Sequence, residues 1–211
     1  HELRTPLTAM QAILNVTRER KRTPEEYEAA LEDLSEETDR LRVLTEDLLY
    51  IARGDAHPII LNEKVNLSNL LTDVSESLRP LAESRGLSIS YQIQNDLWMN
   101  GNSDALIRVF VNLLDNAIKY TEKGEVKINA EWVGTKEIVV LISDTGCGID
   151  PKNLPHIFER FYRVDSGRSR ETGGTGLGLA IVKHVLMQHD AHLEISSTVG
   201  KGSTFTAVFP A

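Results

Sequence analysis

The sequence is poor in cysteine and aromatic residues, and it has no long apolar run. The single cysteine, Cys147, excludes an internal disulfide and fits a reducing compartment, so we expect this chain to act in the cytoplasm. Its longest purely apolar runs, such as Ile138–Ile142, are far shorter than the roughly 20 residues that a membrane-spanning helix needs. We expect any anchor in the inner or plasma membrane to come from segments outside this chain.

Positive charge is also scarce. The 23 lysine and arginine residues are outnumbered by 31 aspartate and glutamate residues, which gives a formal net charge of −8 at pH 7. A protein that binds a nucleic-acid duplex needs a basic face to displace counterions. Because the acidic residues are spread along the chain, the composition indicates a solvated surface and argues against nucleic acid as a partner.

The start of the chain carries two seams of apolar residues at helical spacing. Leucine and methionine recur every three or four residues over 3–14, and a similar seam covers 34–51, which favours helix-on-helix packing. Between the seams, Thr23, Pro24 and Glu26 predict a capping box that begins the second helix. A hairpin of two such helices exposes apolar surface, which a second copy would cover in a four-helix bundle. We therefore expect a homodimer.

Gly54 and Pro58 are expected to break the second helix, after which the pattern changes to mixed helices and strands. This divides the chain into a helical hairpin over 1–57, a linker over 58–65 and a second domain over 66–211. The order of helices and antiparallel strands in that domain predicts a two-layer α/β sandwich. The expected helices cover 66–85, 104–120 and 177–189, with short helical pieces in 151–162, and the expected strands cover 87–93, 124–133, 137–143, 192–197 and 204–209.

Four clusters of residues point to chemistry, and the first begins at His1. A histidine on an exposed helical face can act as a nucleophile through one ring nitrogen while Glu2 accepts the proton of the other. Pro6 has no amide hydrogen, so it frees the Glu2 carbonyl and is expected to kink the helix. Taken alone, such a histidine is more often an ordinary surface residue.

The second cluster lies on the helix expected over 104–120. Asn112 and Asn116 are one turn apart, so their amides share a face, with Lys119 nearby. Amide and phosphate oxygens together suit Mg²⁺, and the lysine can meet phosphate charge. The alternative is a polar helix edge with two ordinary amides.

The third cluster follows an expected strand. Asp144 lies where that strand ends, and its carboxylate can accept a hydrogen bond from an exocyclic amine such as that of adenine. Gly146 and Gly148 let the backbone approach a flat ring. Taken singly, these residues indicate only a tight turn.

The fourth cluster is rich in glycine and leads into a helix. Gly174, Gly176 and Gly178 have a spacing that suggests a dinucleotide-binding motif, but no strand precedes them, and the lysine of a P-loop is missing. What remains is a loop that brings phosphate to a helix N-terminus, where free N–H groups and the helix dipole favour anions.

In their order along the chain, these clusters resemble the sequence boxes of the two-component sensor histidine kinases. Residues 1–7 (HELRTPL) resemble the H box, residues 112–121 the N box and residues 144–148 (DTGCG) the G1 box. Residues 158–163 (FERFYR) resemble the F box and residues 174–179 (GTGLGL) the G2 box. The five motifs occur in family order and cover nearly the whole chain.

The resemblance implies that the hairpin serves dimerisation and phosphotransfer, and that an ATP-binding domain of the Bergerat type follows it. It places Asp144 at the adenine amine, Asn112 and Asn116 at Mg²⁺, and Lys119 and Tyr120 near phosphate or ribose. The residues expected around ATP and Mg²⁺ are Asn112, Asn116, Lys119, Tyr120, Asp144, Gly146, Gly148, Ile149, Phe161, Arg163, Gly174, Thr175, Gly176, Leu177, Gly178, Leu179 and Thr204.

The resemblance also implies a lid over ATP between about residues 150 and 174. Within this lid, Arg163, Arg168 or Arg170 would reach the γ-phosphate or clamp the lid, and the sequence does not choose between them.

The reaction implied by the resemblance uses His1, Glu2 and Thr5 as catalytic residues. His1 takes the γ-phosphate of ATP and passes it to an aspartate on the receiver domain of a response regulator. In the reverse activity, Glu2 and Thr5 would orient a water that dephosphorylates the regulator.

Two other functions remain open. One is a Bergerat ATPase or chaperone-type clamp that hydrolyses ATP without phosphohistidine, in which His1 and the hairpin would have no purpose. The other is a non-enzymatic module gated by nucleotide, against which the intact Asn116, Asp144 and G2 glycines argue.

The chain departs from the family pattern at two places. The family often has Gly-Asp just before the N-box helix, where this chain has Gly101-Asn102. It also favours Gly-Gly before the penultimate strand, where this chain has Asp190-Ala191. Neither pair belongs to the expected ligand set, so we interpret both as local turn changes.

Overall fold

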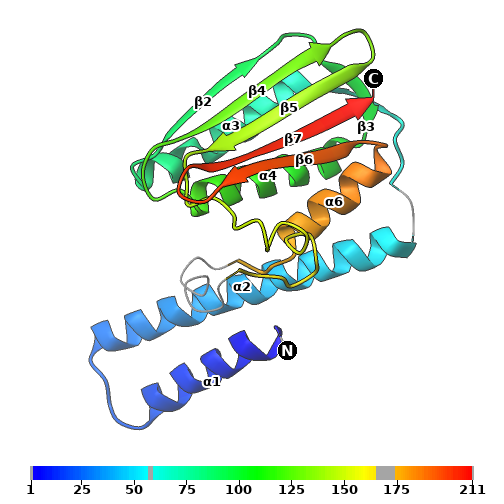
Figure 1. The fold of residues 1–211 in the computed structure, drawn as a ribbon. Helices are drawn as coiled ribbons and strands as arrows, with labels where there is room; N and C mark the ends of the chain where they lie inside the picture. The colour runs from blue at the N-terminus through cyan, green and yellow to red at the C-terminus, as the bar shows by residue number, and fades with distance from the viewer. Residues whose placement is uncertain (1, 57–58, 165–173, 211) are drawn as a thin grey trace.

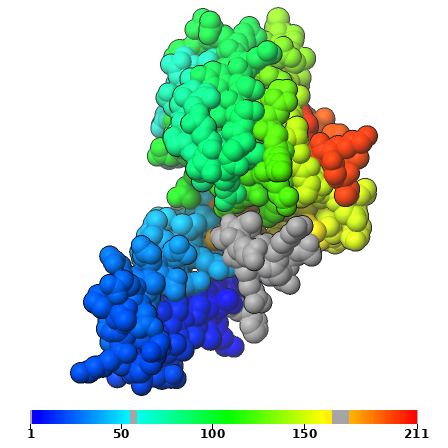
Figure 2. Space-filling view, turned by 90° about the vertical axis from the view of Figure 1, so that its left-hand side faces the viewer, coloured from blue at the N-terminus to red at the C-terminus, as the bar shows by residue number. Residues whose placement is uncertain are grey.

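The computed structural model describes residues 2–56, 59–164 and 174–210 (Figure 1). The helices are α1 (Arg4–Arg18), α2 (Pro24–Ala56), α3 (Leu67–Ser84), α4 (Ser103–Lys119) and α6 (Gly178–Gln188). The strands are β1 (Glu63–Asn66), β2 (Ser88–Ile93), β3 (Trp98–Gly101), β4 (Glu125–Val133), β5 (Glu137–Asp144), β6 (His192–Thr198) and β7 (Gly202–Pro210). Helices α1 and α2 form the predicted hairpin, which lies to one side of the α/β domain with α2 between α1 and that domain (Figures 1 and 2).

The turn between α1 and α2 contains the predicted capping box. Glu26 N donates to Thr23 Oγ1 at 3.2 Å, and Thr23 N donates to Glu26 Oε2 at 3.0 Å. These bonds satisfy amides that the first turn of α2 would otherwise leave without partners. At its other end, α2 runs through Gly54 and ends at Ala56, within the segment 54–58 that was expected to break it. Glycine weakens a helix without forbidding it, and the contact of α2 with α6 supports this last turn.

The α/β domain is the predicted two-layer sandwich. Its main sheet has the strand order β2-β4-β5-β7-β6, and α3, α4 and α6 lie on one face (Figure 1). The prediction of antiparallel strands was wrong for one pair, since β2 and β4 run parallel. The chain passes through α4 between these two strands, which is the kind of helical crossover that parallel pairing requires.

A second, smaller sheet pairs β1 with β3 in antiparallel fashion. Neither strand was predicted from the sequence, and residues 63–65 fall within the expected linker. Asn66 ends β1 and caps α3, because its side chain accepts a hydrogen bond from Asn69 N at 3.0 Å. The small sheet therefore fixes where α3 begins.

The core lies between the helices and the main sheet. Phe110 of α4 and Phe209 of β7 are both fully buried there, with ring centroids 6.1 Å apart. Burial of an aromatic side chain of this size contributes about 1.5–3 kcal/mol to folding. This packing fixes α4, which carries the predicted N box, against the strands that carry Asp144 and Thr204.

Residues 151–162 form successive turns where short helical pieces were predicted. Asn153 N donates to Asp150 O at 2.8 Å, and His156 N donates to Asn153 O at 2.9 Å. Pro151 and Pro155 have no amide hydrogen to continue such bonds into a regular helix. Within the described ranges, no helix combines the length and the apolar character needed to cross a membrane.

Candidate nucleotide-binding site

Asp144 lies at the end of β5, the central strand of the main sheet, and is held by two backbone amides. Its Oδ1 accepts hydrogen bonds from Gly146 N at 2.8 Å and from Ser203 N at 3.2 Å. Burial raises the pKa of this carboxyl, and the two amide bonds oppose that rise. Within the described residues both donors bind Oδ1, so Oδ2 can accept a hydrogen bond from an exocyclic amine.

The glycines that follow Asp144 allow close backbone contacts. A Cβ atom on Gly146 would lie 2.2 Å from the carbonyl oxygen of Tyr120, and Cys147 N donates to that oxygen at 3.1 Å. Gly148 has a φ of +67°, and a Cβ atom there would lie 2.1 Å from Thr198 O. Larger residues would not fit, so this loop lies directly against the end of α4.

The predicted N-box residues lie along α4. Asn112 Nδ2 donates to Arg108 O at 2.8 Å, and a Cβ atom on Gly178 would lie 2.4 Å from Asn112 Oδ1. Asn112 therefore packs against the first residue of α6. Asn116 is half-buried one turn later, and Lys119 Nζ lies 2.6 Å from Asp115 Oδ2. The structure thus brings the N box to the end of the glycine-rich loop.

The F box and the G2 box meet through their backbones. Phe161 N donates to Gly176 O at 2.9 Å, and a Cβ atom on Gly176 would lie 2.9 Å from Phe161 Cα. Phe161 has a φ of +67°, which is unusual for a bulky residue, and such strained conformations cluster at functional sites. The fully buried Leu177 donates its amide to Thr175 Oγ1 at 3.3 Å. These contacts fix the path of the loop into α6.

Two further predicted residues lie beside the Asp144 loop. Ile149 N donates to Ser197 Oγ at 2.8 Å. Thr204 Oγ1 lies 2.9 Å from the hydroxyl of Ser143, which directly precedes Asp144. Both residues therefore belong to the polar surroundings of the same loop.

Tyr120 lies at the end of α4, where its carbonyl oxygen contacts the turn that follows Asp144. Burial raises the pKa of its hydroxyl, and the positive charge of Arg163 opposes the rise. The other two candidate lid arginines, Arg168 and Arg170, lie outside the described residues.

The predicted catalytic residues are only partly described. His1 lies outside the described residues. Glu2 is half-buried in a turn, and Thr5 is exposed in the first turn of α1. Pro6 also lies in this first turn, where its missing amide needs no helical partner.

Sequence reasoning missed two residues that support the site. Ser203 holds Asp144 through its backbone amide, a contact that its side chain does not signal. Asp47 of α2 accepts a hydrogen bond from Thr175 Oγ1 at 3.2 Å, although 128 residues separate the two in the sequence. Among the many acidic residues of α2, nothing in the sequence distinguishes Asp47.

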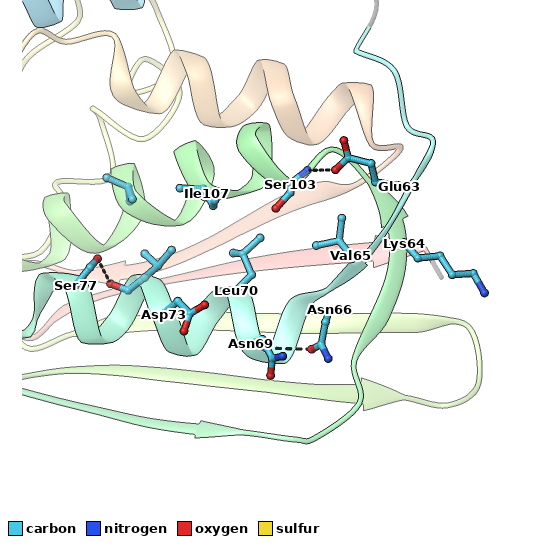
Figure 3. A pocket seen from close by; sticks show the side chains of 12 residues that line it. Glu63, Lys64, Val65, Asn66, Asn69, Leu70, Asp73, Ser77, Ser103 and Ile107 are labelled. Carbon is cyan, nitrogen blue, oxygen red and sulfur yellow. Dashed lines mark hydrogen bonds between the residues drawn. The ribbon is translucent and has the colours of Figure 1, made fainter.

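A separate hollow of about 520 Å³ lies between the beginnings of α3 and α4 and contains none of the predicted nucleotide residues (Figure 3). Its floor includes the apolar Leu70 and Ile107, and its rim includes Glu63 and Asp73. Glu63 Oε2 accepts a hydrogen bond from Ser103 N at 3.3 Å, which links β1 to the start of α4. Lys64 also lines the hollow, so its charged side chains are of both signs.

Comparison with known proteins identifies both parts of the chain. Residues 101–211 match the family model described as histidine kinase-, DNA gyrase B- and HSP90-like ATPase, and residues 1–57 match the His Kinase A (phospho-acceptor) domain. The phosphate regulon sensor protein PhoR of Pseudomonas aeruginosa is 42% identical over 213 residues, covering 99% of this chain and 48% of that protein. The chain therefore spans about half the length of this relative.

Solved structures share the fold. Full-length ShkA in complex with AMPPNP matches with a TM-score of 0.76 and 28% identity, covering 100% of this chain and 44% of ShkA. The histidine kinase ThkA in complex with the response regulator protein TrrA matches with a TM-score of 0.77 and 20% identity, covering 100% of this chain and 59% of ThkA. At that identity, the second match shows a shared fold.

Proposed function

Since this chain belongs to the two-component sensor histidine kinases, we propose that it transfers the γ-phosphate of ATP to His1 and then to an aspartate of a response regulator. The observation that carries the proposal is the anchored carboxylate of Asp144. Both observed bonds go to its Oδ1, and the turn that follows it lies against Tyr120 at the end of the N-box helix, on a chain whose hairpin begins with the H box.

We expect ATP to bind here in one orientation. The adenine amine would donate to Asp144 Oδ2, and the ring would lie beside the Gly146–Gly148 turn, whose glycines allow close packing against Tyr120 and Thr198. The phosphates would extend toward the start of α6, where free N–H groups and the helix dipole favour anions. The ShkA structure contains AMPPNP, an ATP analogue, which supports the same use of the fold here.

Mg²⁺ suits the donor atoms on α4. The Nδ2 of Asn112 is engaged by Arg108 O, which leaves Oδ1 as the atom that Asn112 can offer to a metal. Asn116 would supply a second amide oxygen, and phosphate oxygens and waters would complete the coordination. Such an ion would neutralise phosphate charge.

The phosphotransfer itself needs a nucleophile and a proton acceptor. One imidazole nitrogen of His1 would bond to the γ-phosphorus while the bond from that phosphorus to the β–γ bridging oxygen breaks, releasing ADP. Glu2 would accept the proton of the other ring nitrogen. Positioning and charge neutralisation would supply most of the catalysis. The phosphohistidine would then pass its phosphoryl group to the regulator's aspartate.

The hairpin surface supports a homodimer. Leu7 is 48% exposed, Leu14 47% and Leu31 66% in the single chain. A second copy would bury such side chains in a four-helix bundle.

The proposed division of the chain is a hairpin over 1–57, a linker over 58–65 and an ATP-binding domain over 66–211. We propose that the kinase reaction takes place in the cytoplasm, with any membrane anchor outside this chain.

The kinase proposal is tested by incubating the chain with ATP labelled at the γ-phosphate. We expect label on the protein that survives alkali and is lost in acid, as a phosphohistidine would be, and no label on His1→Gln. Release of labelled phosphate from an unlabelled protein would instead support a Bergerat ATPase.

A further inference from the structure

One face of α2 docks on the α/β domain. Asp47, Tyr50 and Gly54 are spaced by three and four residues, so they lie along one side of the helix. The α/β domain meets them with residues from α4, the glycine-rich loop and α6, namely Arg108, Thr175, His184 and Gln188.

Asp47 forms the contact nearest to the candidate nucleotide site. Its Oδ2 accepts a hydrogen bond from Thr175 Oγ1 at 3.2 Å, and its Oδ1 lies 3.8 Å from Arg108 Nη1. The Asp47 side chain is only 13% exposed, and burial raises the pKa of its carboxyl while Thr175 and Arg108 oppose the rise. One carboxylate of the hairpin thus contacts both the glycine-rich loop and the N-box helix.

Tyr50 extends this contact by one turn. The Arg108 guanidinium carbon lies 4.5 Å from the centre of the Tyr50 ring, within the range of a cation–π interaction. Arg108 O also holds Asn112 Nδ2, so α2 touches the same turn of α4 that positions a predicted Mg²⁺ ligand.

Gly54 forms a second attachment point near the end of α2. A Cβ atom on Gly54 would lie 2.2 Å from His184 Nε2, so a larger residue here would displace the His184 ring from its place between α2 and α6. Gln188 Nε2 donates to Gly54 O at 3.3 Å, and Gln188 Oε1 accepts a hydrogen bond from Ile59 N. This attachment does not involve the glycine-rich loop.

The contact at Thr175 conflicts with phosphate binding. A threonine hydroxyl has one hydrogen to donate, and here it is donated to Asp47 Oδ2. A phosphate oxygen that uses the same hydroxyl must take this hydrogen from Asp47. The two anions would also repel each other at such short range.

We propose that Asp47 is a latch between the hairpin and the α/β domain, and that Asp47 and the nucleotide phosphates exclude each other at Thr175. The proposal rests on the proposed function, because it assumes that Thr175 belongs to the nucleotide site. Nucleotide binding then releases the α/β domain from α2 and frees it to approach His1. Since such coupling is reciprocal, any change that weakens the docked interface tightens nucleotide binding.

The test measures the affinity of the whole chain for AMPPNP with Mg²⁺, by calorimetry, in the parent and three variants. Asp47→Ala removes the latch, and Gly54→Ala loosens the interface at the attachment that lies apart from the glycine-rich loop. Glu46→Ala is the matched control, because Glu46 is the adjacent acidic residue and pairs with Arg42 on its own helix. Alanine is well tolerated in a helix, and thermal melts verify that each variant is folded.

We expect Asp47→Ala and Gly54→Ala each to bind AMPPNP roughly three- to tenfold more tightly than the parent, and Glu46→Ala to match the parent. Equal affinity in all four proteins would overturn the latch and leave the nucleotide site intact. Weaker binding by Asp47→Ala would also overturn it, since Asp47 would then assist the nucleotide. A parent that binds no AMPPNP would instead contradict the proposed function.

Discussion

The ring of His189 joins the end of α6 to the start of α4 through the backbone of Asn102. His189 Nε2 accepts a hydrogen bond from Asn102 N at 3.1 Å, and Nδ1 lies 2.8 Å from Val185 O. Since a carbonyl oxygen only accepts, Nδ1 carries the hydrogen and the ring is neutral. Asn102 also caps α4, because its side chain accepts from Ala105 N at 3.0 Å. A buried neutral histidine therefore supports the helix that carries the N box.

This relationship predicts a loss of stability in mild acid. Burial lowers the pKa of His189 from its ordinary 6.5, so the unfolded chain binds a proton more readily than the folded chain. The contribution of neutral His189 is then fully present above about pH 6.5 and declines as the pH falls, by at most about 1.4 kcal/mol per pH unit. The measurement is the free energy of unfolding in urea at pH 7.5 and 5.5.

The effect of His189 is separated from other titrating groups by comparing variants. His189→Gln removes the titration, so its stability should fall less between the two pH values than that of the parent. His192→Gln is the control, because the His192 side chain is 60% exposed. If His189→Gln and the parent lost the same free energy, His189 would not be the responsible group.

Asp144→Asn is expected to weaken adenine nucleotide binding while preserving the fold. The amide oxygen can still accept from Gly146 N and Ser203 N, but an NH₂ group replaces the acceptor that faces the adenine amine. We expect the affinity for ADP to fall roughly ten- to hundredfold, and the preference for ADP over GDP to shrink. Titration calorimetry with both nucleotides measures this.

The matched control for Asp144 is Asp150→Asn, since Asp150 is a carboxylate in the same segment that binds Lys152 N. It should leave the affinity for ADP unchanged. An Asp144→Asn variant that bound ADP like the parent would place the adenine elsewhere.

Asp190 occupies a backbone conformation that favours glycine. It follows α6 with a φ of +52°, and Ala191 N donates to Leu186 O at 2.9 Å, which closes the helix end. This is one of the two positions where the chain departs from the family pattern, which favours glycine here. Because the left-handed conformation disfavours a Cβ atom, we expect Asp190→Gly to be about 1 kcal/mol more stable than Asp190→Ala.

At Met187 the same two substitutions should give the opposite order of stability, with the alanine variant more stable than the glycine variant. Met187 is exposed within α6, where glycine is about 1 kcal/mol less stable than alanine. Chemical denaturation of the four variants measures both differences. Equal free energies of unfolding for Asp190→Ala and Asp190→Gly would show that backbone conformation does not limit stability at this turn.

The sequence predicted most of the fold where local chemistry decides the structure. Thr23 and Glu26 lie three residues apart and form their capping box without help from the rest of the chain. The parallel pairing of β2 and β4 was missed, because alternating side chains do not reveal which strand lies next to which. The four-residue strands β1 and β3 are too short to show any periodicity.

The candidate site also has parts that the local sequence predicts and parts that it does not. Asp144 and its glycines form a local turn that their residue types and spacing predict, while the role of Asp144 at adenine comes from the family resemblance and stays a prediction. The contact between Asp47 and Thr175 depends on how two domains dock, and no local pattern of either segment encodes it. Contacts of this kind require the structure.

Thr5→Ala is expected to remove dephosphorylation of the regulator while keeping most autophosphorylation. Thr5 is exposed in the first turn of α1, one turn after His1 in the sequence, where its hydroxyl can hold a water but has no part in the attack on ATP. Thr8→Ala is the control, because the Thr8 hydroxyl already donates to Arg4 O at 2.9 Å. The measurement is the loss of label from a pre-phosphorylated response regulator after the chain is added without ATP. We expect the rate of label loss from the regulator to fall about tenfold or more with Thr5→Ala and to stay at the parent rate with Thr8→Ala. If Thr5→Ala dephosphorylated the regulator at the parent rate, either another residue would hold the water or the protein would carry out only the kinase reaction.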